Sequence, residues 1–252
     1  MRRPPAIKAN KFILSGDSVF HTLQGEGSNV GTQATFIRLH YCNLACNFCD
    51  TPYTWNPKLP EYSNEPTEVD FLELADIILE AKKAKGLKSK FLNFGKLVFT
   101  GGEPLLQQAS IGSFLSSPAG INYSAEIETN GTIEPDELLS MLITSRRVML
   151  NISPKLSNSG NPLRPTNSIK AYSPFSIYKF VVKDVSDLEE INKFVSDHYL
   201  DKEKVYIMPE GQNSEECSKT LNKELVYTCL AEGYNITPRF QHDLFKGETR
   251  AV

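Results

Sequence analysis

The sequence lacks the features that would place the protein in a membrane or on nucleic acid. No apolar run approaches the roughly 18 residues of a membrane-spanning helix, and the charged N-terminus has no apolar core of a secretory signal. Lys and Arg do not outnumber Asp and Glu: 27 against 30 gives a net charge of −3, which disfavours a general nucleic-acid binder. We therefore expect a cytoplasmic protein with no membrane partner and no nucleic-acid partner.

Cysteine is scarce, and its odd count of five argues against a disulfide framework. Three of the five, Cys42, Cys46 and Cys49, lie in one short segment, which points to a reducing compartment and to metal or redox chemistry. The other two, Cys217 and Cys229, fall in a stretch of helical character, and we interpret them as small core or surface residues.

Short β-like runs alternate with helical patterns along the chain. We predict helices that begin near Thr67, Pro104, Pro135, Ser186 and Ser214. The predicted strands cover residues 34–40, 96–100, 123–129, 146–153, 177–182 and 204–209. This alternation indicates an α/β fold with a mainly parallel sheet. Because about six strands are too few for a closed eight-stranded barrel, we predict a partial, open (β/α) barrel.

The 252 residues fit a single domain, since α/β barrels of this length are routinely one domain. We expect residues 1–15 to form an N-terminal extension. The Pro- and Asn-rich stretch 52–66 and the stretch 156–175 are predicted to be loop insertions.

Five polar loops follow predicted strands. They are the cysteine loop after 34–40, TGGEP after 96–100, ETNG after 123–129, SPK after 146–153 and MPEG after 204–209. Ligands of parallel α/β folds bind beyond the carboxyl ends of the strands. We therefore expect the five loops to meet on one face and to form a site there.

The cysteine loop has the pattern C-x₃-C-x₂-C. One alternative interpretation is a structural zinc site, but zinc needs four ligands, and the closest histidine, His40, precedes Cys42 by only two residues. Another is that the three thiols bind no metal. Iron–sulfur clusters take thiolate ligands, and four cysteines ligate them fully. Three cysteines would leave one iron open to a substrate or cofactor.

This spacing, with Phe48 before the last cysteine, resembles the signature of the radical S-adenosylmethionine (SAM) superfamily. The resemblance implies a 4Fe-4S cluster on Cys42, Cys46 and Cys49, whose open iron binds the amino and carboxylate groups of SAM. It also implies reductive cleavage of SAM to methionine and a 5′-deoxyadenosyl radical, which abstracts a hydrogen atom from the substrate.

The segment Gly101-Gly102-Glu103-Pro104 supports this resemblance. By itself it could be a tight strand-to-helix turn with Pro at the first helical position. Adjacent glycines also let a ligand approach the backbone closely, and a matching motif in the superfamily binds the SAM amino group.

Further motifs narrow the resemblance. They are LQGEG at 23–27, Arg38, CDT at 49–51 with Trp55 after it, TGGEP, ETNG, SPK and the late His242. Together they resemble the 7-carboxy-7-deazaguanine synthases. The resemblance implies conversion of 6-carboxy-5,6,7,8-tetrahydropterin to 7-carboxy-7-deazaguanine with loss of ammonia, in 7-deazapurine (queuosine-type) biosynthesis. It further implies that SAM is regenerated, that Mg²⁺ takes part, that the enzyme is a homodimer and that an electron donor such as flavodoxin or ferredoxin reduces it.

The family positions assign one set of residues to SAM. They are Phe48, Cys49, Asp50, Gly101, Gly102, Glu103, Glu128, Asn130, Ser153, Pro154 and Lys155. The segment ETNG could instead be a simple Asn-Gly turn, and Lys155 could be an ordinary surface lysine.

A second set is assigned to the pterin. It consists of Leu23, Gln24, Gly25, Glu26, Arg38, Thr100, His242 and Val252 with its terminal carboxylate. Gln24 and Glu26 can match the amide-like edge and exocyclic amine with paired hydrogen bonds, and Glu26 is also assigned a catalytic role. Arg38 offers a planar cationic fork for the substrate carboxylate. The alternatives are solvated turn residues for the first two and an ordinary salt bridge for Arg38.

Thr51 matches the family position that ligates Mg²⁺. This ion commonly keeps several waters and takes substrate oxygens, so a single hydroxyl can suffice. The simpler interpretation is a hydroxyl that caps the next turn beside Asp50.

Two other functions stay open. An activating enzyme for glycyl-radical enzymes shares C-x₃-C-x₂-C and GGEP-like motifs, but it should lack LQGEG and CDT. A non-enzymatic iron–sulfur carrier or zinc-binding module would need a fourth ligand and would not need five polar loops on one face.

Overall fold

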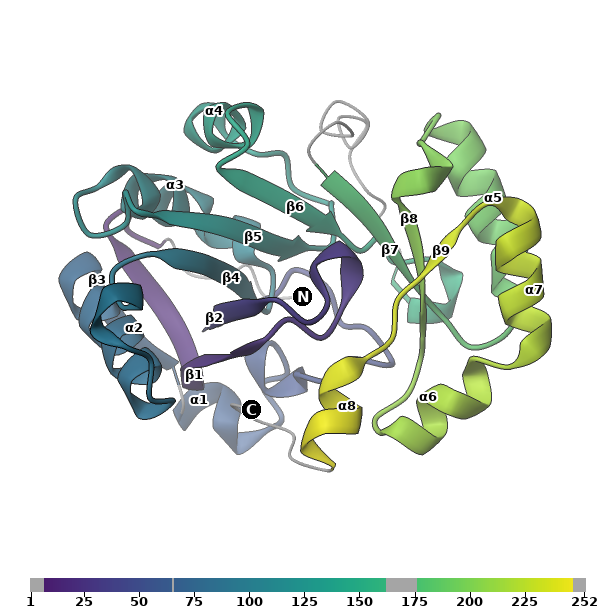
Figure 1. Cartoon of the computed structure of the whole chain (residues 1–252), viewed down its shortest axis with the longest axis horizontal. Coiled ribbons are helices and arrows are strands. Elements are labelled where there is room, and N and C mark those ends of the chain that lie inside the picture. Colours follow the sequence, from purple (N-terminus) through teal and green to yellow (C-terminus); the bar gives the residue numbers. More distant parts are fainter. Residues whose placement is uncertain (1–6, 65, 162–175, 247–252) are drawn as a thin grey trace.

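The computed structural model describes residues 7–64, 66–161 and 176–246. Within these ranges, nine strands form one sheet in the order β3-β1-β2-β4-β5-β6-β7-β8-β9 (Figure 1). The strands are β1 (Lys11–Leu23), β2 (Gln33–Leu39), β3 (Pro66–Asp70), β4 (Gly95–Gly101), β5 (Tyr123–Thr129), β6 (Val148–Ile152), β7 (Ser176–Val182), β8 (Val205–Pro209) and β9 (Asn235–Ile236).

Helices connect the strands. The α-helices are α1 (Pro60–Asn64), α2 (Phe71–Ala84), α3 (Gln108–Ser116), α4 (Glu137–Thr144), α5 (Asp187–Asp197), α6 (Ser214–Thr220), α7 (Lys223–Glu232) and α8 (Phe240–Phe245). Short 3₁₀ turns are η1 (Gly27–Asn29), η2 (Pro52–Thr54), η3 (Ser89–Phe91), η4 (Pro104–Gln107), η5 (Ser157–Ser159) and η7 (Lys202–Lys204). In the part of the chain that the structure describes, no helix is long and apolar enough to cross a membrane.

The sheet is open and mainly parallel, which confirms the predicted fold class. The ladder from β2 through β4 to β9 is parallel, whereas β1 is antiparallel to both β2 and β3. All six predicted strands are present, as β2 and β4 to β8. The pattern does not reveal β1, whose register shifts between Leu14 and Val19, or β9, which has only two residues.

Two predicted boundaries are wrong. The helix expected from Thr67 begins at Phe71, because Asp70 and Glu73 form a capping box at its start. The preceding residues form β3 and pair with β1 from Lys11 to Ser15. The N-terminal extension predicted over 1–15 therefore stops before Lys11, since the backbone from that residue on is hydrogen-bonded in the sheet.

The segments predicted as insertions are only partly described. The stretch 52–66 contains η2 and α1, whose Tyr62 packs against the rings of His40 and Tyr41. The stretch 156–175 lies outside the described residues from position 162 on. Cys217 and Cys229 are buried in two helices, α6 and α7, rather than in one.

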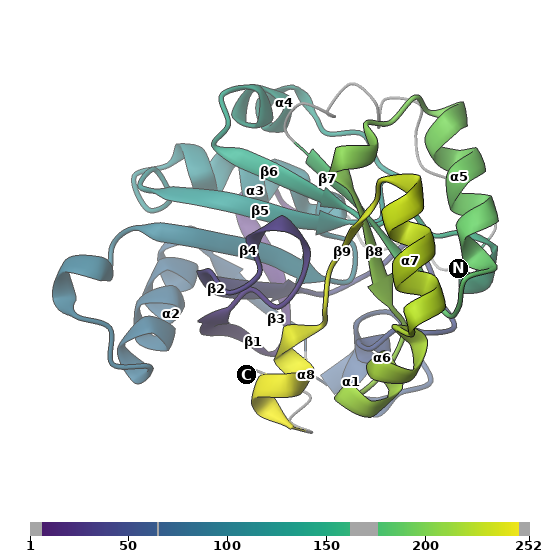
Figure 2. The same ribbon diagram turned by 45° about the vertical axis from the view of Figure 1, so that its right-hand side comes forward.

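Side-chain alternation gives the sheet two different faces. On β7, Tyr178, Phe180 and Val182 pack in the hydrophobic core, whereas Lys179 and Val181 line a cavity on the opposite face, because successive strand side chains point to opposite sides. The core face is covered by α2, α3, α4, α5 and α7, whose apolar side chains belong to the same core (Figure 1, Figure 2).

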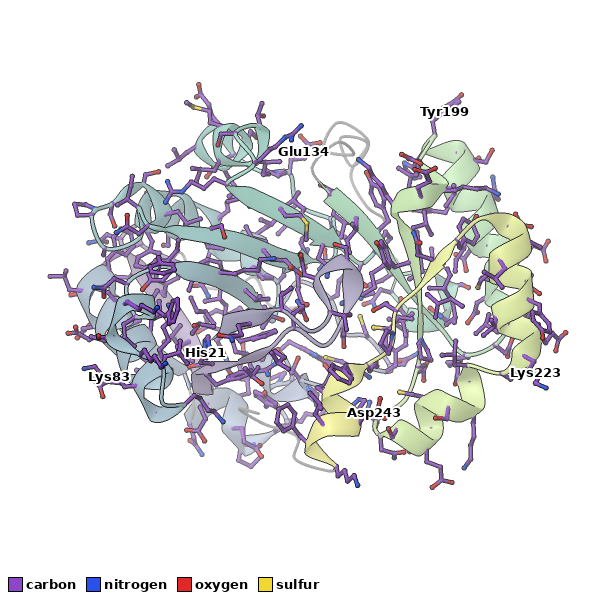
Figure 3. The ribbon with its side chains drawn as sticks, viewed as in Figure 1. His21, Lys83, Glu134, Tyr199, Lys223 and Asp243 are labelled. Atoms are coloured by element: carbon purple, nitrogen blue, oxygen red, sulfur yellow. The ribbon has the colours of Figure 1, made fainter. Side chains whose placement is uncertain are left out.

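The outer helices present charge to solvent. Lys83 on α2 and Lys223 on α7 point outward at opposite ends of the molecule (Figure 3), and Lys83 forms an exposed ion pair with Glu80. Such exposed pairs contribute little to stability. The charged residues Glu26, Arg38 and Lys179 instead line the cavity on the face of the sheet opposite the core.

Candidate active site

A cavity of about 320 Å³ lies at the carboxyl ends of the parallel strands. All five polar loops expected there contribute to its lining. The predicted site residues that line it are Leu23, Gln24, Gly25, Glu26, Arg38, Cys42, Cys46, Phe48, Cys49, Asp50, Thr51, Thr100, Gly101, Gly102, Glu103, Glu128, Asn130, Ser153, Lys155 and His242. Of the other two, Pro154 is not part of the lining, and Val252 lies outside the described residues.

The sulfurs of Cys42, Cys46 and Cys49 each accept a hydrogen bond from a neutral donor. The donors, in that order, are Leu44 N at 3.4 Å, Asn161 Nδ2 at 3.2 Å and Trp55 Nε1 at 3.2 Å. Burial raises the pKa of the Cys42 thiol to about 12. The free thiol is therefore protonated at neutral pH, and iron must displace its proton on binding.

This set of donors fits an iron–sulfur cluster. Hydrogen bonds to the sulfurs are one of the means by which proteins set the reduction potential of such a cluster. Within the described ranges, no three His, Cys, Asp or Glu side chains are grouped as ligands of a single metal ion. In a four-iron cluster each thiolate binds its own iron, so the three sulfurs do not have to converge on one point.

The Gly101-Gly102 turn packs directly against the cysteine loop. Gly101 has a φ of +110°, a conformation that side chains rarely adopt. A Cβ atom on Gly102 would lie 1.9 Å from the backbone oxygen of Tyr41, so only glycine fits. Gly102 N donates to Leu39 O at 2.9 Å and Glu103 N donates to Tyr41 O at 2.8 Å. These contacts fix the start of the cysteine loop against the end of β4.

The carboxylate of Glu103 is buried and joins two loops of the site. It accepts hydrogen bonds from Leu105 N at 2.9 Å, Thr129 Oγ1 at 2.7 Å and Asn130 N at 2.8 Å. Burial raises the pKa of Glu103, and these three donors oppose that effect. The side chain assigned to SAM therefore ties the glycine turn to the end of β5.

The loops after β5 and β6 also reach the cysteine loop. Asn130 Nδ2 donates to Asn43 Oδ1 at 2.9 Å. Lys155 Nζ donates to Ser153 Oγ at 2.7 Å and lies 5.9 Å from the ring centroid of Phe48. The residues assigned to SAM are thus brought together around the three thiols.

Gln24 lines the cavity, and hydrogen bonds to the protein fix the orientation of its side-chain amide. We call Gln24, Glu26, Glu128 and Lys179 the floor of the cavity. It is 1% exposed. Its Nε2 donates to Glu126 Oε1 at 2.9 Å and Glu128 Oε1 at 3.3 Å, and its Oε1 accepts from Glu26 N at 3.1 Å. Both amide protons are used by the protein, so Gln24 can offer a ligand only the second lone pair of Oε1.

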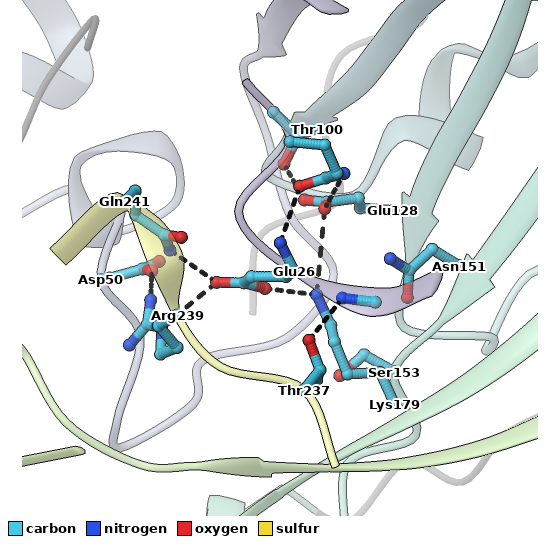
Figure 4. A network of polar contacts seen from close by, with 12 residues as sticks. Glu26, Asp50, Thr100, Glu128, Asn151, Ser153, Lys179, Thr237, Arg239 and Gln241 are labelled. Atoms are coloured by element: carbon cyan, nitrogen blue, oxygen red, sulfur yellow. Dashed lines mark hydrogen bonds and ion pairs between the residues drawn. The ribbon is translucent and has the colours of Figure 1, made fainter. Parts of the chain in front are cut away.

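Glu26 is the centre of a buried ion-pair network (Figure 4). Its Oε2 lies 2.5 Å from Lys179 Nζ, and its Oε1 accepts from Arg239 Nε at 3.2 Å and Gln241 Nε2 at 2.7 Å. Burial raises the pKa of Glu26, but attraction to Lys179 and Arg239 more than reverses this and places the pKa well below its usual value. The carboxylate is therefore ionised, and it is not a solvated turn residue.

Arg38 and Thr100 are paired on the neighbouring strands β2 and β4, and both line the cavity. The Arg38 guanidinium lies 5.6 Å from the ring centroid of Phe20 and has no ion pair with the described residues. Thr100 Oγ1 donates to Glu128 Oε2 at 2.7 Å. Arg38, which is assigned to the pterin, and Glu128, which is assigned to SAM, therefore line the same cavity.

Thr51 and His242 complete the predicted set. Thr51 Oγ1 donates to Gly101 O at 3.3 Å and lies 3.7 Å from Cys49 Sγ. His242 lines the cavity from α8, and its buried Nε2 has no partner among the described residues. Burial lowers the pKa of His242, which favours the neutral imidazole.

Sequence reasoning misses three cavity residues that contact Glu26: Lys179, Arg239 and Gln241. Lys179 carries a usable signal, since it is the charged residue within the apolar strand pattern IYKFVV. Its neighbours alternate with it, which places it on the face opposite the core. Arg239 and Gln241 lie beside the predicted His242 but in a segment without periodicity, so only the fold reveals them.

Comparisons with known proteins agree with this geometry. Residues 36–173 match the model of the Radical SAM superfamily. The 7-carboxy-7-deazaguanine synthase of Pyrobaculum aerophilum is 32% identical over 232 residues, covering 92% of this chain and 94% of that protein. The Halobacterium salinarum protein of the same name is 30% identical over 262 residues, covering 93% and 89%. The crystal structure of QueE from Escherichia coli has a similar fold, with a TM-score of 0.61 at 21% identity over 90% of this chain and 93% of that chain.

Proposed function

The chain belongs to the 7-carboxy-7-deazaguanine synthases of the radical SAM superfamily, and from this premise we propose its reaction. It converts 6-carboxy-5,6,7,8-tetrahydropterin to 7-carboxy-7-deazaguanine and ammonia, as a carbon–nitrogen lyase of 7-deazapurine biosynthesis. The atoms of the substrate equal those of the two products, so the net reaction needs no external oxidant or reductant. The observation that carries the proposal is one cavity that joins three thiols, the glycine turn and the ionised Glu26.

Cys42, Cys46 and Cys49 would hold a 4Fe-4S cluster, and SAM would bind its open iron beside Gly102 and Lys155. When bound, these cofactors supply the radical chemistry that removes a hydrogen atom from the substrate. The protein positions both partners and excludes water. The close packing of Gly102 on the cysteine loop supports this arrangement, because it brings backbone groups to the cavity beside the thiols.

The floor of the cavity would bind the pterin. The carboxylate of Glu26 can accept hydrogen bonds from the ring N–H and the exocyclic amine. Glu128, which the family positions assign to SAM, lies 3.8 Å from Lys179 Nζ beside Glu26, and we propose that it is a second acceptor for the pterin instead. Arg38, which has no ion pair with the described residues, can pair with the substrate carboxylate through two parallel hydrogen bonds. His242 offers a neutral imidazole to the same space.

We also propose that Thr51 contributes to a Mg²⁺ site shared with the substrate carboxylate. Its hydroxyl lines the cavity beside Cys49 and Gly101. Waters and substrate oxygens would complete the coordination shell. An electron donor such as flavodoxin or ferredoxin, a homodimeric state and a cytoplasmic location complete the proposal.

Product formation tests the proposed reaction. The protein is reconstituted with iron and sulfide without oxygen, reduced, and incubated with SAM, Mg²⁺ and the carboxytetrahydropterin; mass spectrometry then detects the deazapurine. We expect product that requires both SAM and the cluster. Cleavage of SAM without deazapurine would favour the activating-enzyme alternative and would overturn the assignment.

Metal analysis separates the enzyme from a carrier or a zinc module. We expect about four iron atoms and four sulfides in each chain, and a change in the electron paramagnetic resonance (EPR) spectrum of the reduced cluster when SAM is added. A cluster whose spectrum is indifferent to SAM, or zinc in place of iron, would contradict the proposal.

A further inference from the structure

Lys179 lines the cavity and contacts Glu26, yet neither set of family-assigned residues includes it. Its strand neighbours Tyr178 and Phe180 pack in the core, and its own side chain is 6% exposed. Burying an ammonium group without a partner is costly. The groups that pair with Lys179 therefore explain its position on this face.

Two carboxylates from separate elements meet at the Lys179 ammonium (Figure 4). Glu26, which follows β1, lies 2.5 Å from Nζ, and Glu128 on β5 lies 3.8 Å from it. The Gln24 amide joins the same two residues, since Nε2 donates to Glu128 and Oε1 accepts from Glu26 N. Lys179 therefore joins the two acidic side chains, and Gln24 links the backbone of Glu26 to the side chain of Glu128.

Carboxylates that share a site repel each other, so without a cation between them one would take up a proton. A protonated carboxyl presents an O–H donor, which cannot accept from the N–H groups of a pterin edge. Burial opposes the charge on Lys179, but attraction to Glu26 and Glu128 raises the pKa of Lys179 above its usual value. The ammonium is therefore charged and available to balance both carboxylates.

We propose that Lys179 is a positioning residue that determines specificity: it keeps Glu26 and Glu128 as paired acceptors for the N–H edge of the pterin ring. This inference rests on the proposed function. Lys179 acts through the two carboxylates rather than at the reacting carbon. The two carboxylates then select a planar heterocycle with adjacent N–H donors, and they disfavour an analogue that lacks the exocyclic amine, because a desolvated carboxylate oxygen would lose one of its donors.

Other charged or titratable groups also surround Lys179 and its two carboxylates. They are Arg239 and His242 in the C-terminal segment, Asp50 in the cysteine loop, Glu126 on β5 with Lys96 on β4 beside it, and Cys217 on α6. Removing Lys179 leaves Arg239 as the cation in direct contact with Glu26 among the described residues. The pKa of the carboxylate pair should then rise, so binding should fail at low pH and recover as the pH increases.

Variants of Lys179 test this inference. Lys179→Gln keeps a hydrogen-bond donor and removes the charge, Lys179→Met removes both, and Lys179→Arg keeps the charge. Lys183→Met is the matched control, because Lys183 follows the same strand but is exposed and does not line the cavity. Affinity for 7-carboxy-7-deazaguanine, which retains the same N–H edge, is measured by calorimetry from pH 6 to 9, together with kcat, KM and SAM binding.

We expect Lys179→Gln and Lys179→Met to weaken product affinity at pH 6.5 by at least about tenfold, with a deficit that shrinks as the pH rises. KM should increase more than kcat falls, and SAM binding should be unchanged. Lys179→Arg should keep the pH profile of the wild type, and Lys183→Met should match the wild type throughout.

Two outcomes would overturn the inference. If the variants bind the product as tightly as the wild type, Lys179 has no role in recognising the pterin ring. If they bind it more weakly by the same factor at every pH, the role of Lys179 is only structural. If the uncharged variants do not fold, Lys179→Arg decides, since a pH profile unlike that of the wild type contradicts the role of the charge. A wild type without activity would refute the proposed function, whereas an active wild type with unaffected variants would refute this inference alone.

Discussion

The two halves of the cavity are held together by different interactions. The cluster half consists of the cysteine loop, the Gly101-Gly102 turn and the Ser153–Lys155 loop, and it depends on backbone hydrogen bonds and close backbone contact. The substrate half consists of Gln24, Glu26, Glu128, Lys179 and Arg239, and it depends on buried ion pairs and amide hydrogen bonds. Substitutions in the cluster half should therefore abolish activity, whereas those in the substrate half should weaken it in a charge-dependent way.

Arg239 connects the two halves. Its Nε lies 3.2 Å from Glu26 Oε1, and its Nη2 lies 2.5 Å from Asp50 Oδ2 in the cysteine loop. Its Nη1 donates to Gly211 O at 2.5 Å. One buried guanidinium thus fixes the substrate floor relative to the cluster loop.

The largest effect is expected from Cys42→Ala, in the cluster half. Loss of one of three thiolates should prevent assembly of the cluster, so iron content and product should both fall to background. Cys229→Ala is the control, because Cys229 is buried in α7 and does not line the cavity. A Cys42→Ala protein that still forms the deazapurine would refute the assigned cluster ligands.

Gly102→Ala should have the next largest effect. The added Cβ would lie 1.9 Å from Tyr41 O, so the glycine turn must move away from the cysteine loop. We expect activity to fall by more than about a hundredfold and SAM affinity to drop with it. Gly86→Ala is the control: Gly86 has a positive φ, which Gly102 does not, but its added Cβ meets nothing within 4 Å. Equal effects of the two changes would contradict a role for the close packing of Gly102 on the cysteine loop.

Arg239→Gln should remove the ion pairs to Glu26 and Asp50 that connect the two halves, and it should leave the other residues of each half in place. We expect kcat/KM to fall by about thirtyfold, or about 2 kcal/mol, because Glu26 and Asp50 each lose a buried cation. Iron content should match that of the wild type. Lys223→Gln, on the exposed side of α7, controls for loss of a positive charge. An Arg239→Gln protein with wild-type kinetics would show that the halves are positioned independently.

The smallest effect is expected from Trp55→Phe. This change removes the hydrogen bond from Nε1 to Cys49 Sγ and keeps an aromatic ring. A donor to sulfur stabilises the reduced, more negative cluster, so the reduction potential should fall by roughly 40 mV, the equivalent of about 1 kcal/mol. Redox titration followed by EPR measures it, and an unchanged or raised potential would contradict this role for Trp55.

The same contrast explains how much of the molecule was predictable. Residues of the cluster half lie in short contiguous motifs at strand ends, so their spacing predicts both the cysteine loop and the glycine turn. Ion pairs of the substrate half join positions far apart in the chain, such as Glu26 with Lys179 and Arg239. No local pattern specifies such pairs, although strand alternation could have placed Lys179, which the prediction missed, on the cavity face.

Secondary structure shows a similar limit. The six predicted strands of the parallel sheet are present because each is a compact apolar run. The prediction fails at Thr67, where Pro66–Asp70 joins the sheet edge through pairing with a distant part of β1. Such pairing is a tertiary interaction, and it overrides the local helical pattern.

The most direct test measures how many molecules of deazapurine are formed for each molecule of SAM supplied. Reduced, reconstituted protein is supplied with a limiting amount of SAM and an excess of 6-carboxy-5,6,7,8-tetrahydropterin, and 7-carboxy-7-deazaguanine is quantified against methionine and 5′-deoxyadenosine. If SAM is regenerated, we expect deazapurine in clear excess over the SAM supplied, and none with Cys42→Ala. SAM consumed to methionine and 5′-deoxyadenosine with no deazapurine would contradict it.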